Sequence, residues 1–167
     1  RRFKRKYFST GDYRFTHCDA ESFERDIDTL MRFWKQKWSP EKGRSRTDKV
    51  ARNFEKVLVA AFKTEALFLP ILWKGDTPLA GLGHVMDPKN GAMHFIIAGR
   101  DTSADEAFIG AALHFHSIEC AILLGCQSYD FGHGDEAYKF SYGAKKTKVV
   151  YLSVNRPDAE ADMLFDS

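Results

Sequence analysis

The chain has 167 residues, of which 44% are hydrophobic and 29% are charged. These fractions are typical of one compact globular domain, and no apolar run reaches the ~20 residues that a membrane-spanning helix requires. The composition therefore excludes a disordered protein and a membrane-embedded one. The net charge of +2 is too small to predict nucleic acid as a partner, because a polyanion is attracted by a strongly basic surface.

The first residues and the cysteines indicate where the protein works. The sequence begins without Met, and its basic run at residues 1–6 is not followed by the apolar segment of a secretory signal. The three cysteines are odd in number and form no Cys-x-x-Cys pair, so they predict neither a disulfide framework nor a metal site. Cys120 and Cys126 are interpreted as small core residues. We expect a cytoplasmic, metal-free single domain that forms one lobe of a longer protein.

Two amphipathic helices are predicted before any long strand. After a short strand at residues 13–15, Asp19 is a suitable N-cap for a helix whose apolar residues recur at three- and four-residue steps. These residues are Phe23, Ile27, Leu30, Met31, Trp34 and Trp38. Polar residues 39–46 are expected to end this helix, and Thr47 or Asp48 to cap a second one. The apolar face of the second helix consists of Val50, Phe54, Val57, Leu58 and Ala61.

Three apolar segments rich in strand-forming residues follow, separated by turns that contain Gly, Asp and Pro. They are residues 67–73, 79–86 and 92–98, and they predict an antiparallel meander. Pro70 has no N–H for a ladder, so it predicts either an edge strand or a bulge. Gly81 and Gly83 lie on one face of the second strand, where they indicate that something lies close to the backbone.

The apolar period becomes helical again over residues 104–124, and Gly125 suits the position after the last turn. The predicted buried stripe consists of Phe108, Ala111, Ala112, Phe115, Ile118 and Ile122. A short strand at residues 128–131 follows, and the alternating residues 147–154 predict a last strand. Because the helix can carry a parallel crossover, the order of elements predicts a mixed α/β sheet.

Chemically active side chains gather in residues 129–139, which read Tyr-Asp-Phe-Gly-His-Gly-Asp-Glu-Ala-Tyr-Lys. The segment begins in a predicted strand and continues past its carboxyl end, where ligands of mixed sheets commonly lie. Glycine lets a ligand approach the backbone, carboxylate or imidazole can accept a proton, and lysine offers a positive charge. A glycine-rich turn with solvated charges is the alternative interpretation.

This segment resembles the GNAT superfamily of acetyltransferases, in the branch found beside cellulose and exopolysaccharide biosynthesis and related to Fem-type transferases. The matching residues are Tyr129-Asp130-Phe131, Gly134, Asp135-Glu136 and Tyr138-Lys139. Gly99, Asp101, Gly110 and Gly125 match family positions upstream, so the similarity covers most of the chain. At Gly132-His133 the sequence departs from its relatives, which commonly carry a bulkier residue there and often an arginine.

The resemblance implies an α/β (α+β) fold with a mixed, mostly antiparallel central sheet and helices on both faces. It also implies acetyl-CoA or another acyl-CoA as co-substrate. The pyrophosphate is expected on N–H groups at the start of the long helix, where the dipole favours an anion; the residues are Phe108, Ile109, Gly110 and Ala111. Backbone N–H groups at Ile97, Ala98 and Gly99 are expected to stabilise the oxyanion. Ser103 and Glu106 could cap the helix earlier, but a loop or single turn through Glu106 is favoured.

The resemblance further implies direct attack of an acceptor amine, or a sugar hydroxyl, on the thioester. Asp130 or His133 is expected to take the proton, Lys139 to bind an acceptor anion or the developing charge, and Tyr138 to protonate the thiolate. Asp130 has a structural alternative, since a carboxylate at a strand end often caps the next turn. The acceptor is expected to be a small molecule or a glycan precursor, possible classes being amino sugars and cell-envelope precursors.

Two other functions remain open from the sequence. One is a Fem-like transferase that uses aminoacyl-tRNA, against which the lack of a strongly basic face argues. The other is a GNAT-like lobe that has lost catalysis and serves as a binding or scaffolding domain.

The histidines outside this segment predict no metal site. His114 and His116 are two residues apart on a helix and point in nearly opposite directions, so one of them is expected to be packed. His84 and His94 lie on adjacent strands, where they could face each other as a buried, hydrogen-bonded pair.

Overall fold

The computed structural model describes residues 11–104, 108–150 and 152–154. The basic run at residues 1–6, Glu106 and the acidic tail after Arg156 lie outside these ranges. The chain divides into two compact units, the first ending at His133 and the second beginning at Gly134. Within the described ranges, no helix is both long and apolar enough to cross a membrane.

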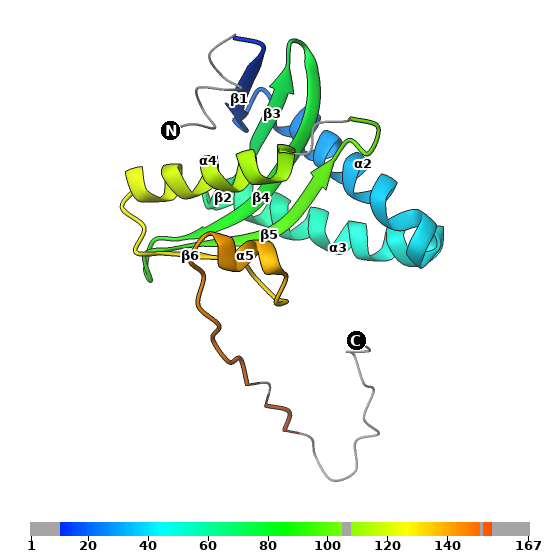
Figure 1. Ribbon diagram of the computed structural model, residues 1–167. Helices are drawn as coiled ribbons and strands as arrows, with labels where there is room; N and C mark the ends of the chain where they lie inside the picture. Colours follow the sequence, from blue (N-terminus) through cyan, green and yellow to red (C-terminus); the bar gives the residue numbers. More distant parts are fainter. Residues whose placement is uncertain (1–10, 105–107, 151, 155–167) are drawn as a thin grey trace. The chain divides into compact units, whose positions relative to one another are not determined.

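The first unit is built on a six-stranded sheet (Figure 1). Its elements are β1 (Tyr13–His17), α2 (Phe23–Lys42), α3 (Arg44–Lys63), β2 (Leu67–Phe68), β3 (Pro70–Lys74), β4 (Thr77–Asp87), β5 (Ala92–Arg100), α4 (Ile109–Leu123) and β6 (Ser128–Asp130). The strands lie in the order β1-β3-β4-β5-β6, and β2 pairs with β4. β5 and β6 run parallel, whereas the other described pairs are antiparallel.

Helices cover both faces of this sheet. α2 and α3 lie on one face and α4 lies on the other (Figure 1). One core cluster, which includes Leu30, Leu58 and Ile97, joins α2 and α3 to the strands. A second cluster, which includes Leu82 and Leu113, joins α4 to the strands. The predicted mixed, mostly antiparallel sheet with helices on both faces is confirmed.

Three glycines let α2 and α3 approach the sheet closely. Gly81 and Gly83 lie on β4, and Gly99 is the register partner of Gly81 on β5. A Cβ at Gly99 would lie 2.5 Å from the carbonyl oxygen of Leu30, and a Cβ at Gly83 would lie 2.8 Å from Leu58 Cδ2. Side chains at Gly83 and Gly99 would overlap the helices, and a Cβ at Gly81 would lie 2.7 Å from Ile71 Cδ1 on β3, so close packing explains these glycines. The close approach predicted at Gly81 and Gly83 is confirmed.

Asp19 organises the turn before α2 and is not the N-cap of the helix. Its Oδ1 accepts hydrogen bonds from the backbone N–H groups of Glu21 (3.1 Å) and Ser22 (2.8 Å). Ser22 occupies the N-cap position. The predicted cap was wrong, because an aspartate carboxylate can hold a local turn as readily as a helix end.

The predicted loop at residues 39–46 was also wrong. α2 continues to Lys42 and α3 begins at Arg44, so Gly43 alone separates the two helices. Gly43 has a φ of 76°, and a single residue in this region is enough to redirect the chain. Thr47 lies inside α3, where its hydroxyl donates to the Gly43 carbonyl at 2.9 Å.

The first strand of the predicted meander is split in two. β2 ends at Phe68 and β3 begins at Pro70, with Leu69 between them. β3 lies between β1 and β4, so Pro70 is the first residue of an interior strand. Neither an edge strand nor a bulge at Pro70 is found, because the first position of a strand also tolerates a missing N–H.

The buried face of α4 agrees with the predicted stripe only in part, since Ala112 is buried in the α4 cluster and Phe108 packs against it. Its buried residues are Ile109, Ala112, Leu113, His114, Ser117 and Ala121. Phe115 and Ile122, both assigned to the stripe, are exposed, Ile122 by 68%. Apolar residues occur on all sides of this helix, so their spacing does not identify the inner face. The start at Ile109 agrees with the favoured later start, and Gly125 follows the end with a φ of 78°.

The second unit contains the short helix α5 (Ala137–Ser141). The sequence predicts a strand at residues 147–154, but residues 147–150 and 152–154 form none. Their apolar side chains are exposed, Val150 by 83% and Leu152 by 87%. Alternation alone does not make a strand, because ladder hydrogen bonds and cross-strand contacts require a partner.

Candidate active site

The pairing between two neighbouring parallel strands ends at the centre of the candidate site, and we call this point the strand separation. β6 pairs with β5 from Ala92–Ser128 to His94–Asp130 and then ends, whereas β5 continues to Arg100. Beyond His94, none of the described strands pairs with β5 on the side of β6. A ligand that carries amide groups can therefore run alongside this strand and satisfy its peptide N–H and C=O groups.

The predicted oxyanion residues lie on this continuation of β5. A one-residue bulge at Ile96 interrupts the pairing with β4, and such bulges redirect strands next to active sites. Ile97 is buried in the α2 and α3 cluster, Ala98 is exposed, and Gly99 has no side chain because α2 lies against it. The chemistry that this segment can offer therefore comes from its backbone.

The start of α4 has the properties of an anion-binding site. Phe108 is the N-cap, with no side-chain hydrogen bond to the helix, and the first turn carries no acidic residue. Gly110 and Ala111 are exposed, and a Cβ at Gly110 would meet nothing within 4 Å. Packing therefore does not require a glycine at this position. Ile109, in contrast, is fully buried and fixes the helix start to the sheet.

Ser103 does not contribute to this helix start. Its backbone N–H and its hydroxyl both donate to Asp101 Oδ1, at 2.9 and 2.6 Å. These hydrogen bonds hold the pKa of Asp101 below its ordinary value. The pair thus forms a local turn at the end of β5, and it keeps the Asp101 carboxylate charged.

Asp130 ends β6 and holds the turn that follows. Its Oδ1 accepts from the Gly132 backbone N–H at 2.8 Å, and its Oδ2 lies 3.2 Å from His94 Nδ1. Gly132 has a φ of 71°, and a Cβ there would lie 3.1 Å from the Phe95 carbonyl oxygen. This geometry fits the structural alternative, in which Asp130 caps the turn. Both of its carboxylate oxygens already accept hydrogen bonds.

His84 and His94 do not form the predicted pair. The register places His84 opposite Phe95 and His94 opposite Val85, so the two rings lie on opposite faces of the sheet. The extra residue in β5, Ile96, decides this outcome. A bulge shifts the register on one side of it by one position, and the side chains there change faces.

A half-buried chain of hydrogen bonds, which the sequence did not predict, joins Tyr129 on β6 to His84 on β4 and His114 on α4. The Tyr129 hydroxyl lies 2.8 Å from His84 Nε2 and 3.0 Å from His114 Nδ1. Burial lowers the pKa of His84 to about 3, so the ring is neutral at physiological pH. Its Nδ1 donates to the Phe68 carbonyl at 3.1 Å. Nε2 therefore accepts the Tyr129 proton, and His114 Nδ1–H donates to the Tyr129 oxygen.

Lys139, in the second unit, is 5% exposed. Its Nζ lies 2.8 Å from Glu136 Oε2 and donates to the Gly134 carbonyl at 3.3 Å. The hydrogen bond from Lys139 is the largest cause that holds the pKa of Glu136 below its ordinary value. The lysine is thus part of an internal ion pair, and its predicted contact with an acceptor stays a prediction.

Tyr138 and His133 are both exposed. Tyr138 belongs to α5, and burial of part of its ring, followed by the charge of Glu136, raises the pKa of its phenol. The phenol therefore keeps its proton at physiological pH, as a group that protonates a thiolate must. His133 is the last residue of the first unit. The catalytic roles of these two residues stay predictions.

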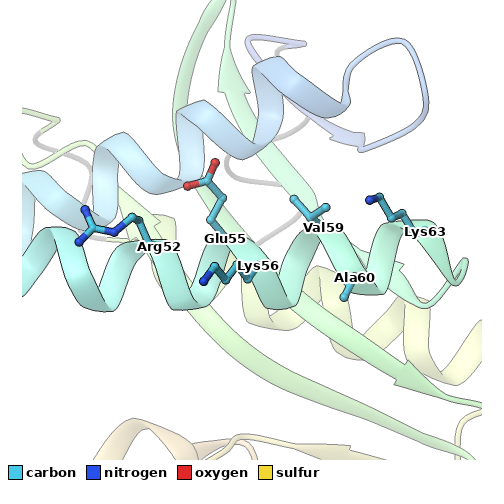
Figure 2. Close-up of a pocket in the computed structure, with 6 residues that line it drawn as sticks. All are labelled: Arg52, Glu55, Lys56, Val59, Ala60 and Lys63. Carbon is cyan, nitrogen blue, oxygen red and sulfur yellow. The ribbon is translucent and has the colours of Figure 1, made fainter.

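A hollow of about 480 Å³ lies on the outer surface of α3 (Figure 2). It is lined by Arg52, Glu55, Lys56, Val59, Ala60 and Lys63. These residues come from a single helix and include none of those at the strand separation. We assign this hollow no part in the chemistry, because side chains from one exposed helix do not enclose a ligand.

The end of the β5–β6 pairing and the start of α4 both offer backbone groups, which suit a ligand that carries amide groups and phosphates. Residues 1–140 match the family described as Acetyltransferase (GNAT) domain. The chain belongs to the GNAT acetyltransferase family, and it is an acetyltransferase. Sequence comparison with curated proteins finds no match.

Solved structures with the same fold include three informative examples. An aminoglycoside acetyltransferase from an uncultured soil metagenomic sample, in complex with sisomicin, has a TM-score of 0.60 at 11% identity over 88% of this chain and 99% of its own. A PaiA N-acetyltransferase from Thermoplasma acidophilum, in complex with coenzyme A, has a TM-score of 0.58 at 13% identity over 78% of this chain and 86% of its own. A GNAT family acetyltransferase from Brucella melitensis, in complex with acetyl-CoA, has a TM-score of 0.60 at 10% identity over 80% of this chain and 83% of its own. At these identities the likeness shows the fold.

Proposed function

We propose that this protein transfers an acetyl or similar acyl group from CoA to the primary amine of a small acceptor, an amino sugar or a cell-envelope precursor. The observation that carries the proposal is the end of β6 at Asp130 while β5 continues to Arg100, next to an open start of α4. For the acceptor class, support comes from the resemblance of residues 129–139 to the branch associated with exopolysaccharide biosynthesis.

The donor site follows from the two backbone features. A pantetheine chain carries amide groups that can pair with β5 beyond His94, as an added strand would. The pyrophosphate then meets the first turn of α4, where N–H groups and the helix dipole favour negative charge. Gly110 leaves this turn uncovered, which lets the phosphates approach the backbone.

The chemistry is a direct transfer. The amine nitrogen attacks the thioester carbon, the C–S bond breaks, and the acyl group passes to nitrogen while the thiolate takes up a proton. Backbone N–H groups of residues 97–99 stabilise the oxyanion that forms during the attack. We assign the amine proton to His133, because both oxygens of Asp130 already accept hydrogen bonds. Tyr138 keeps its predicted role as the proton donor to the thiolate, and Lys139 its role toward the acceptor.

Acetyl-CoA binding tests the donor site. Acetyl-CoA at 100 times its Kd should raise the free energy of unfolding by about 2.7 kcal/mol. A Gly110→Glu variant should bind it at least about tenfold more weakly, which is about 1.4 kcal/mol, because a carboxylate then lies beside the phosphates. Calorimetric titration measures the affinity. Gly110→Gln is the matched control, with the same size and no charge, and should bind more tightly than Gly110→Glu.

The acceptor is tested by the release of CoA thiol with a panel of compounds. Amino sugars and aminoglycosides should release thiol, whereas matched sugars with a hydroxyl in place of the amine should not. Binding of acetyl-CoA without thiol release on any amine would leave the donor site intact and refute the proposed acceptor class. Equal binding by the Glu and Gln variants would refute the placement of the phosphates.

A further inference from the structure

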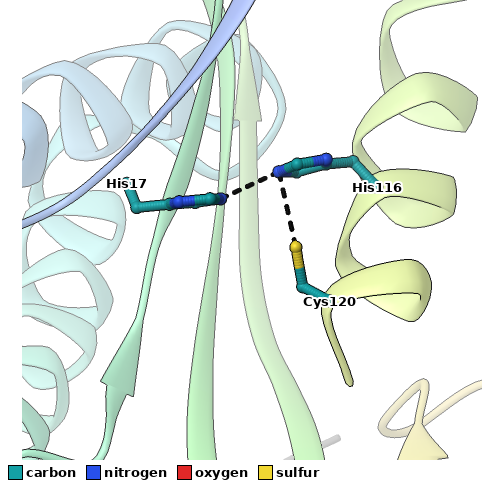
Figure 3. Close-up of side chains that lie close together, drawn as sticks. All are labelled: His17, His116 and Cys120. Carbon is teal, nitrogen blue, oxygen red and sulfur yellow. Dashed lines mark hydrogen bonds between the residues drawn. The ribbon is translucent and has the colours of Figure 1, made fainter. Parts of the chain in front are cut away.

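One group of three potential metal ligands converges within the described residues, away from the candidate active site. It consists of His17, His116 and Cys120 (Figure 3). His17 is the last residue of β1, and His116 and Cys120 are four residues apart on α4. Residues four apart on a helix project to the same side, so both side chains point toward β1.

The distances within this group are close to those of a metal site. His17 Nε2 lies 2.8 Å from His116 Nε2, and Cys120 Sγ lies 3.6 Å from the same His116 nitrogen. All three ligand atoms lie within 4.8 Å of one another. With bonds of about 2.0–2.1 Å to nitrogen and about 2.3 Å to sulfur, a tetrahedral zinc ion separates two nitrogens by about 3.4 Å and nitrogen from sulfur by about 3.6 Å.

The side chains are held in position by aromatic neighbours. Phe15, two residues before His17 on β1, stacks on His116 with ring centroids 3.9 Å apart and planes inclined by 1°. Phe68 lies against His17 at 5.2 Å. Two imidazoles that are fixed from separate elements lose little rotational freedom when they bind an ion. The His17 side is exposed, which gives an ion a path from solvent.

We propose that His17, His116 and Cys120 form a three-ligand site for a divalent transition metal ion, with Zn²⁺ the best fit to two imidazoles and a thiolate. These donors favour zinc over Mg²⁺ or Ca²⁺, which prefer oxygen ligands. Three protein ligands leave the fourth tetrahedral position to water or an exogenous ligand. The expectation of no metal was based on the pair His114 and His116. The pair His116 and Cys120 was not considered, and this proposal therefore reverses that expectation.

Binding requires a defined change of protons and a small movement. Without metal, one proton between the two facing Nε2 atoms explains their 2.8 Å separation as a hydrogen bond. With metal, each neutral imidazole carries its proton on Nδ1, and the thiol of Cys120 loses its proton to solvent. One proton is released for each ion, and the two nitrogens separate by about 0.6 Å to reach the tetrahedral distance.

The site would join β1, which lies at one end of the described strand order, to α4. β1 and β6 occupy opposite ends of the strand order, so the metal ligands lie at the other edge from the separated strands. The proposal therefore does not depend on the proposed function. Its expected effect is on the stability of the first unit, because an ion that binds only the folded form raises the free energy of unfolding.

Cobalt substitution tests the site. Tag-free protein, stripped with chelator and returned to chelator-free buffer, should bind one equivalent of Co²⁺. It should then show the visible bands of tetrahedral cobalt and a near-ultraviolet thiolate-to-cobalt band, both abolished by excess Zn²⁺. Cys120→Ser should remove the thiolate band. Cys120→Ser and His116→Ala should each weaken Zn²⁺ binding at least about 100-fold, because the loss of a ligand costs more than the loss of a hydrogen bond to a ligand.

Cys126→Ser is the matched control, because it removes a half-buried thiol outside the cluster and should leave both bands unchanged. Zn²⁺ should raise the melting temperature of this control and of the original protein, but not that of Cys120→Ser. A cobalt spectrum without a thiolate band, or one that persists in Cys120→Ser, would overturn the proposal. So would stabilisation by Zn²⁺ of equal size in all variants.

Discussion

The hydrogen-bond chain through Tyr129 is an unusually constrained arrangement of single residues. His84 is fully buried and has one nitrogen on a backbone carbonyl and the other on the Tyr129 hydroxyl. The only neutral tautomer that satisfies both contacts carries its proton on Nδ1. Protonation would place a second donor against Tyr129 and charge a group shielded from water, and both effects oppose it.

The stability of the protein should therefore fall as the pH decreases from neutral. The folded-state pKa of His84 is about 3 and the ordinary value is 6.5. Between these values the unfolded chain binds a proton that the folded chain does not, so acid favours unfolding. From pH 7 to pH 5 this residue should lower the free energy of unfolding by about 2 kcal/mol. Urea denaturation at the two pH values measures it.

A His84→Gln variant isolates this contribution. Glutamine can donate and accept hydrogen bonds but does not titrate, so its loss of stability between pH 7 and pH 5 should be smaller by about 2 kcal/mol. Other titrating groups contribute equally to both proteins. The same decrease in the variant and in the original protein would show that His84 is protonated in the folded state.

At the scale of residues, the sequence predicts a motif but not the contacts that surround it. Tyr129 and Asp130 belong to a recognisable motif, but nothing in the spacing of His84 or His114 indicates that both reach the same hydroxyl. That contact depends on the bulge at Ile96 and on which face α4 buries. Both features arise from three-dimensional packing, which local sequence does not record.

Among the elements, α2 depends most on the absence of side chains opposite it. A Cβ at Gly99 would lie 2.5 Å from Leu30 O, 2.9 Å from Phe33 Cβ and 3.0 Å from Trp34 N. Two of these atoms belong to the backbone of α2 and cannot move independently. Gly99→Ala should therefore lower the free energy of unfolding by about 1–3 kcal/mol, the usual cost of overpacking. Urea denaturation measures the change.

Gly110→Ala is the matched control for this substitution. A Cβ at Gly110 meets nothing within 4 Å, and alanine is favoured over glycine in a helix by about 1 kcal/mol. This variant should be as stable as the original protein or more stable. If Gly99→Ala proved equally harmless, α2 would have to lie farther from β5 than the structure shows.

At the scale of elements, the sequence predicted the helices and strands that have a clear apolar period. It failed where the structure depends on contacts with other parts of the chain. The meander and the later start of the long helix are confirmed, because their turns and glycines carry local information. The predicted face of α4 was only partly right, and residues 147–150 and 152–154 do not form the predicted strand. Both depend on a partner surface, and a chain that is apolar on every side does not specify one.

For the whole molecule, the division into two units predicts where the stability lies. Among the described residues, the members of both core clusters lie at or before Leu113, within the first unit. A chain that ends at His133 should therefore retain a cooperative thermal transition and the near-ultraviolet circular dichroism of buried Trp34 and Trp73. The measurement compares this fragment with the full chain. A fragment that lacks the transition would show that the second unit is needed for folding.

The continuation of β5 past the end of β6 also affects how the protein behaves in concentrated solution. An uncovered strand edge is a template for strands from other chains, and it promotes self-association. The bulge at Ile96 and the charged Arg100 at the end of the strand make this template irregular. A thioester donor along the same edge would occupy the groups that recruit other chains. Supplying the donor should therefore keep the enzyme dispersed as well as ready to react.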